Sequence, residues 1–309
     1  FGPPAAAPII LNAFQIATAC ILYFFIPAEK TTAAYAVGFS AVIASMVQII
    51  WSLHALRGSL VWTQSTQMAL DHSRAVFKRF IPAMLGLGTL QLNTMLDSVI
   101  AMWPTFVGPL MFGRPVPLDE KSNAILGFTQ QFYQFPLGVF GIAVATAIFP
   151  LLSRSVDSPS EFAAYLRRGL RLSFYIGLPA SIGLVLIRHD LIYVVYSGGD
   201  TGFSADGVAR SAAVLLGFAP AIWVYSLNHV LTRAYYAKHD TTTPMRVAIA
   251  MVIINIALNL TLIWSLKEAG LAWATAISAL LQMLVLLFLS PRLLGVYPID
   301  IPTSIGFLR

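Results

Sequence analysis

The sequence predicts an all-α protein, a polytopic membrane helix bundle with about eight spans. Of its 309 residues, 58% are hydrophobic and only 10% are charged, which does not describe the surface of a soluble domain. The apolar runs between the charges are mostly about 20 residues long, enough to cross a hydrocarbon core of roughly 30 Å. They are too long and too uniformly apolar for the alternating strands of a membrane barrel, so helices are expected.

Each expected span is an apolar run bordered by charged residues, proline or glycine. The spans cover residues 5–27, 33–56, 81–104, 124–152, 172–194, 207–236, 243–265 and 269–290. This pattern excludes a nucleic-acid-binding interpretation of the formal charge of +6. The single cysteine, Cys20, has no partner, so no disulfide framework is expected. Because the chain starts at Phe1 without a basic leader, we expect an internal piece of a longer protein.

The basic residues predict the orientation of the spans. Connections after the even-numbered spans contain 13 of the 19 Lys and Arg residues, and the alternate connections contain 6. Cytoplasmic connections carry the excess, so the even-numbered ones are expected to face the cytoplasm. In two of them, residues 68–80 and 159–170, apolar and basic side chains recur at helical spacing. We expect amphipathic helices on the inner leaflet there, with solvated loops as the alternative.

An internal sequence repeat predicts two related lobes, as in many transporters. Two spans share one residue spacing: Phe39, Ile43 and Gln48 in the second, and Trp273, Ile277 and Gln282 in the eighth. Residues 1–56 are therefore expected to be the last two helices of an N-terminal lobe, and 57–80 a cytoplasmic amphipathic linker. Residues 81–290 would form a six-helix C-terminal lobe, and 291–309 would start a following segment.

Asp97 is the one acidic residue deep in an expected span. A charge at that depth costs about 3 kcal/mol on insertion scales, so Asp97 needs a partner or a wet cavity. Further oxygen donors lie in the same span and in the last two spans: Asn93, Asn255, Asn259 and Thr275. Oxygen ligands of this kind predict a site for a small, hard cation. The alternative is a buried hydrogen-bond network, or a protonated Asp97, that holds three helices together.

The span 124–152 combines polar residues with helix-bending ones. Three glutamines within little more than one turn are too polar for a lipid-facing stripe and are predicted to line a substrate cavity: Gln130, Gln131 and Gln134. Pro136 removes a backbone donor and bends the helix, while Gly138 and Gly141 allow close approach of another helix. We predict a hinge at these three residues, with a static kink as the alternative.

Enzyme signatures are nearly absent from the sequence, which contains no HExxH, P-loop, dinucleotide fingerprint or CxxC motif. The nearest pattern is Asn93-x-x-x-Asp97, which is similar to the diphosphate-binding motif of intramembrane polyprenyl transferases. The series continues to Ala101, and no second acidic motif follows. We therefore expect a transporter without an organic cofactor, and keep the polyprenyl transferase as a remote alternative.

Three strings between residues 133 and 275 resemble the MurJ (MviN) family of lipid II flippases, in the MOP superfamily. They are YQFPLGVFGIAVAT with FPLLSR at residues 133–154, RAYYAKHDTTTP at 233–244, and GLAWAT at 270–275. The likeness is collinear over nearly the whole chain. It implies a partial MOP/MATE-like two-lobe fold in which this chain holds roughly the fifth to twelfth of fourteen spans.

The resemblance also implies a function. Such a protein would flip lipid II, the undecaprenyl-diphosphate-linked peptidoglycan precursor, across the bacterial cytoplasmic membrane by alternating access. Its partners would be lipid II, membrane lipid and cell-wall synthesis proteins, and not nucleic acid. A polysaccharide-lipid flippase or a cation-coupled multidrug antiporter of the same superfamily is the alternative.

Some relatives couple transport to Na⁺, and the matching positions here are Asp97, Asn255, Asn259 and Thr275. Two residues depart from the family pattern. Gln131 stands where relatives often have arginine, and Asn259 replaces a carboxylate found in some of them. The first departure removes a positive charge for the diphosphate, and the second removes a negative charge from the ion site.

Overall fold

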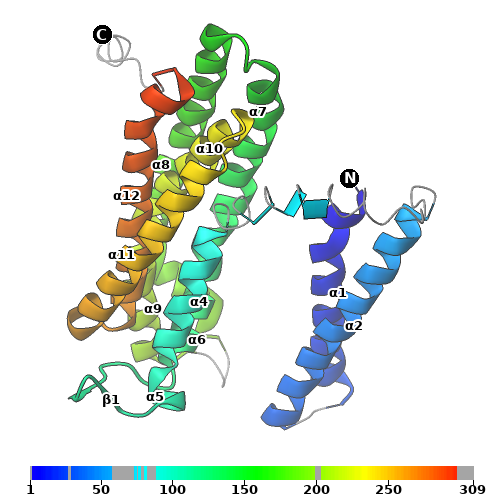
Figure 1. The fold of residues 1–309 in the computed structure, drawn as a ribbon. Helices are drawn as coiled ribbons and strands as arrows, with labels where there is room; N and C mark the ends of the chain where they lie inside the picture. The colour runs from blue at the N-terminus through cyan, green and yellow to red at the C-terminus, as the bar shows by residue number, and fades with distance from the viewer. Residues whose placement is uncertain are drawn as a thin grey trace. The chain divides into compact units, whose positions relative to one another are not determined.

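Most described residues lie in helices in the structure, a computed structural model (Figure 1). It describes residues 2–26, 29–57, 73–74, 76–77, 80–81, 88–198 and 203–297. The chain forms two units, Phe1–His72 and Ser73–Arg309. Their boundary falls inside the expected linker 57–80, most of which lies outside the described residues. The assignment of the two units to lobes stays a prediction.

Unit 1 is a pair of packed helices, α1 (Gly2–Phe24) and α2 (Lys30–Leu56). Small residues lie where the helices meet, since Ser40 and Ala44, one turn apart on α2, are buried. Large apolar side chains such as Ile16 and Phe39 are instead exposed, by 63% and 67%. Exposed apolar surface of this extent is expected of helices that are solvated by lipid.

From residue 88 onward, unit 2 contains two helices and a short hairpin: α4 (Thr89–Ala101), α5 (Trp103–Phe106), β1 (Leu110–Met111) and β2 (Arg114–Pro115). The strands are antiparallel, with Leu110 opposite Pro115 and Met111 opposite Arg114. A bent helix follows: α6 (Ser122–Pro136), the π-helical turn η1 (Leu137–Ile142) and α7 (Ala143–Arg154). The remaining segments are α8 (Pro159–Tyr196), α9 (Ala205–Phe218), the 3₁₀ turn η2 (Ala219–Ala221), α10 (Ile222–Ala237), α11 (Thr242–Leu266) and α12 (Glu268–Leu294).

Six helical segments in the described residues are long and apolar enough to cross a membrane. They are Thr31–Leu56, Ser122–Arg154, Pro159–Tyr196, Ala205–Ala237, Thr242–Leu266 and Glu268–Arg292. These match six of the eight expected spans. The first expected span forms α1, with a shorter apolar segment at Ile9–Phe24. The third expected span is described at residue 81 and from residue 88 onward. The all-α membrane helix bundle is thus confirmed.

The amphipathic segment 159–170 does not lie on the membrane as a separate helix, so that prediction is wrong. It is the first part of the continuous helix α8. Phe162 and Leu166 on this segment are fully buried, and a Cβ at Gly169 would touch Val230 of α10 and Ile148 of α7. The apolar face therefore packs on protein. The companion segment 68–80 lies mostly outside the described residues.

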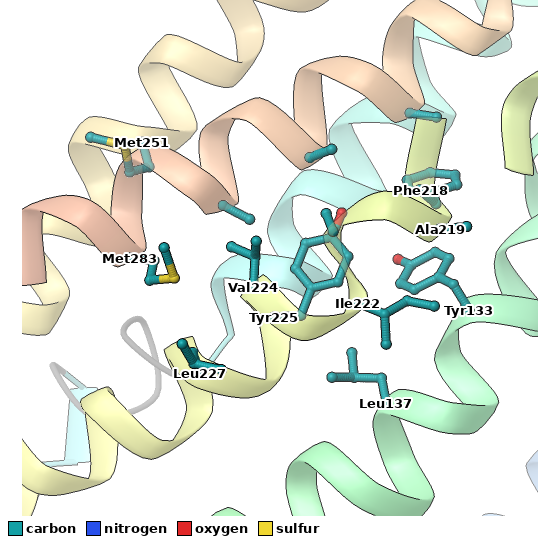
Figure 2. Packing of buried hydrophobic residues seen from close by; sticks show 14 of the residues in the cluster. Tyr133, Leu137, Phe218, Ala219, Ile222, Val224, Tyr225, Leu227, Met251 and Met283 are labelled. Atoms are coloured by element: carbon teal, nitrogen blue, oxygen red, sulfur yellow. The ribbon is translucent and has the colours of Figure 1, made fainter. Parts of the chain in front are cut away.

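The core of unit 2 forms where α6, α9, α10 and α12 meet. Tyr133 stacks on Phe218 with ring centroids 4.6 Å apart and lies 5.6 Å from the ring of Tyr225 (Figure 2). At Gly217, an added Cβ would lie 2.6 Å from the Cβ of Ala272, so only glycine lets α9 pack this closely on α12. Such packing suits a helix bundle in lipid, where dispersion contacts replace much of the hydrophobic driving force.

Candidate functional site

A hydrogen-bonded polar network joins α4, α11 and α12 inside unit 2. Asp97 Oδ1 accepts from Asn259 Nδ2 at 2.7 Å, and Asp97 Oδ2 accepts from Thr275 Oγ1 at 2.9 Å. Asn259 Nδ2 also donates to Asn255 Oδ1 at 3.1 Å, and Asn255 Nδ2 donates to Thr275 Oγ1 at 3.2 Å. The structure therefore brings together the four residues that were predicted as ion ligands.

Local geometry places these side chains at one depth. Asn255 and Asn259 lie one turn apart and share a face of α11. The tight turn at Lys267, with φ of 53°, reverses the chain into α12. Asn259 lies seven residues before the end of α11, and Thr275 lies seven residues after the start of α12, each about 10 Å from the turn. The antiparallel pairing of the two helices thus makes them neighbours.

The network is sealed from solvent, because Asp97, Asn255 and Asn259 are 0% exposed. Its hydrogen-bond donors are neutral, and no ion pair to Asp97 occurs in the part of the chain that the structure describes. An ionised carboxylate buried without a countercharge is strongly disfavoured. Asp97 is therefore stabilised in this network either by a cation or by a proton.

The oxygens present fit a hard cation. Asn93 Oδ1 and Asn259 Oδ1 are buried and have no hydrogen-bond partner. Asn259 Nδ2 occupies the point where Asp97 Oδ1 and Asn255 Oδ1 converge. Amide oxygen and nitrogen have nearly the same shape, so half a turn of this amide would present a third oxygen at that point. The donor set then consists of oxygen atoms, as alkali and alkaline-earth cations prefer.

The three predicted cavity glutamines lie in different surroundings. Gln130 is buried, and its Nε2 has no hydrogen-bond partner. Gln131 is exposed, and Gln134 is half-buried. Successive helical residues point about 100° apart, so Gln134 lies between Gln130 and Gln131 around the helix, and Gln131 forms the exposed edge of the face that the three share. A role in lining a substrate cavity stays a prediction.

The predicted hinge coincides with a change of helix type. Pro136 ends α6, and the π-helical turn η1 follows at once. A proline leaves the carbonyl one turn earlier without its usual donor, and a π-turn adjusts the helix around such a defect. At Gly141 an added Cβ would lie 2.5 Å from Ser226 Oγ of α10, whereas at Gly138 it would meet nothing within 4 Å. Gly141 therefore serves close packing, and motion at this point stays a prediction.

A second polar cluster was not anticipated from the sequence. Arg210 of α9 donates two hydrogen bonds to Asp119, of 2.8 and 2.9 Å, and one of 2.6 Å to Glu268 at the start of α12. These hydrogen bonds from Arg210 lower the pKa of Asp119 to about 2. The one local signal was Asp206, four residues before Arg210 on the same helix. The other two partners are distant in sequence.

Comparison with known proteins identifies the family. The family model "Lipid II flippase MurJ" matches residues 1–303. The chain belongs to the MurJ family. A "Probable lipid II flippase MurJ" of Vibrio cholerae is 31% identical over 300 residues, which cover 96% of this chain and 53% of that protein. The "Lipid II flippase MurJ" of Burkholderia cenocepacia is 26% identical over 317 residues, covering 100% of this chain and 56% of that protein.

Solved structures share the fold. "Lipid II flippase MurJ, inward closed conformation" aligns with a TM-score of 0.72 and 22% identity over 93% of this chain and 56% of that one. An outward-facing "multidrug resistance MATE family transporter of the MOP superfamily" aligns with a TM-score of 0.56 and 17% identity over 72% of this chain. The chain therefore shares the fold of these two transporters over the aligned residues. MurJ membership and the apolar helices make this a multi-pass protein of the bacterial inner membrane.

The chain spans about half the length of the curated MurJ relatives that it matches. The match lies in unit 1 and unit 2 alike, since residues 1–303 are included.

Proposed function

We propose that the protein containing this chain flips lipid II from the inner to the outer leaflet during cell-wall synthesis. The match of the MurJ family model over residues 1–303 carries this proposal. The same match favours a lipid II flippase over a polysaccharide-lipid flippase, a multidrug antiporter or a polyprenyl transferase. The activity requires alternating access, and the bent helix α6–η1–α7 offers one place for the fold to flex.

The test is depletion of the intact protein in a bacterium that has no second flippase. Lipid II is expected to accumulate in the inner leaflet, followed by lysis, because the outer leaflet no longer receives precursor. A plasmid copy of the gene should restore transport, which excludes polar effects on neighbouring genes. Normal outward transport of lipid II in the depleted cells would reject the proposal.

We also propose Na⁺ as a coupling ion, held by Asp97, Asn255, Asn259 and Thr275. The support is the sealed network with one carboxylate, neutral donors and two orphaned amide oxygens. A bound cation would supply the positive charge that this carboxylate otherwise lacks. The Asn259 amide occupies the same point when it donates to Asp97. The network can therefore alternate between a hydrogen-bonded form and an ion-holding form.

A further inference from the structure

One face of α8 carries three arginines beside a shallow concavity. The concavity has a volume of about 540 Å³ and is lined by Ala164, Arg167, Arg168, Arg171, Leu172 and Tyr175. These residues are spaced three or four apart along the helix, so their side chains share one face. Arg168 and Arg171 are exposed, and neither forms an ion pair with any residue that the structure describes.

The charges along α8 place these arginines at the level of the lipid headgroups. Between Arg171 and Arg188 lie 16 residues without Asp, Glu, Lys or Arg, about 24 Å of helix. With arginine side chains reaching outward at both ends, this length matches a hydrocarbon core of roughly 30 Å. The residues before Arg171 therefore extend beyond the hydrocarbon, and Tyr175 lies where interfacial aromatic residues gather.

The arginines lie at the basic end of unit 2. Lys238 Nζ donates to Val156 O at 2.7 Å, which joins the end of α10 to the connection between α7 and α8. In and near this end the described residues include eight Lys and Arg against three Asp and Glu, while the opposite end has five of each. Basic ends of membrane helices face the cytoplasm, so the three arginines meet the inner leaflet.

The arginine face continues into surface that suits acyl chains. Tyr175, Ile182 and Leu186 follow Arg168 and Arg171 on the same stripe of α8 and are 56%, 52% and 73% exposed. The acidic residue on this face, Glu161, lies seven residues before Arg168, about 10 Å along the axis. A molecule with an anionic head and a hydrocarbon tail would match both parts of the stripe.

We propose that this face of α8 binds an anionic glycerophospholipid of the inner leaflet. The phosphate would lie between Arg168 and Arg171, whose planar guanidinium groups suit paired hydrogen bonds to phosphate oxygens. An acyl chain would then run along Tyr175, Ile182 and Leu186. A bilayer phospholipid is the occupant because the stripe is exposed, helical and continuous with the lipid-facing surface of α8.

The test measures which lipid lies beside α8 in the intact protein. Leu172→Cys, in a Cys20→Ser background, is labelled with a fluorophore and reconstituted in phosphatidylcholine vesicles. Nitroxide-labelled phosphatidylglycerol or phosphatidylcholine then quenches the label in proportion to its occupancy. Phosphatidylglycerol is expected to quench preferentially, and Arg168→Gln/Arg171→Gln should reduce this preference at least about fivefold. The matched pair Arg114→Gln/Arg188→Gln, at the opposite end of unit 2, should leave it unchanged.

Three results would overturn the proposal. Equal quenching by both lipids would show that the face has no preference for anionic lipid. Quenching by neither lipid would show that another protein segment covers it. Displacement of nitroxide-labelled phosphatidylglycerol by undecaprenyl diphosphate more readily than by unlabelled phosphatidylglycerol would show a site for a prenyl diphosphate instead. Each of these results is measured as lipid contact with α8 and not as transport, so failure of this proposal is distinguishable from failure of the proposed function.

Discussion

Asp97 receives hydrogen bonds from one amide and one hydroxyl, and both donors are neutral. A neutral donor stabilises a carboxylate less than a cation does. A cation or a proton that enters the network would therefore stabilise the Asp97 side chain further. The sequence made this residue and its hydrogen-bond partners predictable, because polar side chains are rare and energetically costly within apolar spans. Their mutual distances depended on the pairing of α11 with α12, which the residue pattern alone does not specify.

Asp97→Asn should abolish stabilisation of the intact protein by sodium. Asparagine keeps the shape and an acceptor oxygen but removes the only formal negative charge among the proposed ligands. An ion that binds only the folded state raises the apparent melting temperature, so thermal unfolding in sodium and in potassium salts measures the effect. Asp119→Asn makes the same chemical change outside the network and should retain the sodium shift. Equal shifts in wild type and Asp97→Asn would eliminate the ion role of Asp97.

At the scale of the elements, helix positions were predictable and helix surroundings were not. The apolar runs gave the spans because their length is set by the membrane. Segment 159–170 was misjudged because an amphipathic pattern shows one apolar face without showing whether lipid or protein covers it. The two glycines of the predicted hinge illustrate the same limit, since Gly138 and Gly141 look alike in sequence and only Gly141 packs closely against another helix.

Gly141→Ala should destabilise unit 2 by about 1–3 kcal/mol, since the new Cβ lies 2.5 Å from Ser226 Oγ and 2.9 Å from Leu137 Cδ1. Gly138→Ala adds the same methyl group in open space and should be neutral or slightly stabilising. Resistance of the purified intact protein to thermal unfolding compares the two variants. Adding Ser226→Ala to Gly141→Ala should recover part of the loss. Equal effects of the two glycine variants would contradict the close-packing explanation.

At the scale of the whole molecule, the sequence did not predict the ion pairs between residues that are far apart in the chain. Arg210 meets Asp119 and Glu268 across separations of 91 and 58 residues, so no local pattern could reveal the cluster. It ties the connection before α6, the start of α9 and the turn between α11 and α12 to one another. These connections share the end of unit 2 that is expected to face outward.

Arg210→Gln should destabilise the protein far more than Asp119→Asn. Glu268 is only 2% exposed, so loss of Arg210 leaves a buried charge unpaired, a defect that typically costs about 3–5 kcal/mol. The Asp119 side chain is 53% exposed, and its own contribution should be within about 1 kcal/mol. Chemical denaturation of each variant and of the double variant measures both effects. Similar losses for the two single variants would contradict the assigned role of Glu268.

The Asp119 contribution should also depend on pH. Its pKa is lowered to about 2 in the folded chain, so its ionised form is favoured by folding. The stabilisation is therefore full above the ordinary carboxyl pKa of about 4 and is lost as the pH falls toward 2. Asp119→Asn should lack this part of the acid dependence of unfolding. An unchanged acid profile in the variant would show that the ion pair does not contribute.

The orientation of the chain can be tested at its connections. Reporter fusions after Asp157 and His239 should read cytoplasmic, and those after Arg114 and Lys267 should read external. The reason is that the excess of basic residues lies at the end of unit 2 that contains Asp157 and His239. Paired reporters that are active only inside or only outside the cell provide mutual controls. A cytoplasmic signal after Lys267 would reverse the expected orientation of α11 and α12.

Asn259 and Thr275 lie at equal distances from the turn at Lys267, and this restricts where insertions and deletions can be tolerated in the sequence. Each residue added to or removed from a helix rotates everything beyond it by about 100°. A single-residue deletion within 260–266 would carry both asparagines of α11 out of phase with Thr275 and Asp97, although hydropathy would hardly change. The number of residues from Asn259 to Thr275, 16, therefore has to stay constant for the network to form. Insertions should be tolerated in connections such as 155–158, where no helical phase has to be kept.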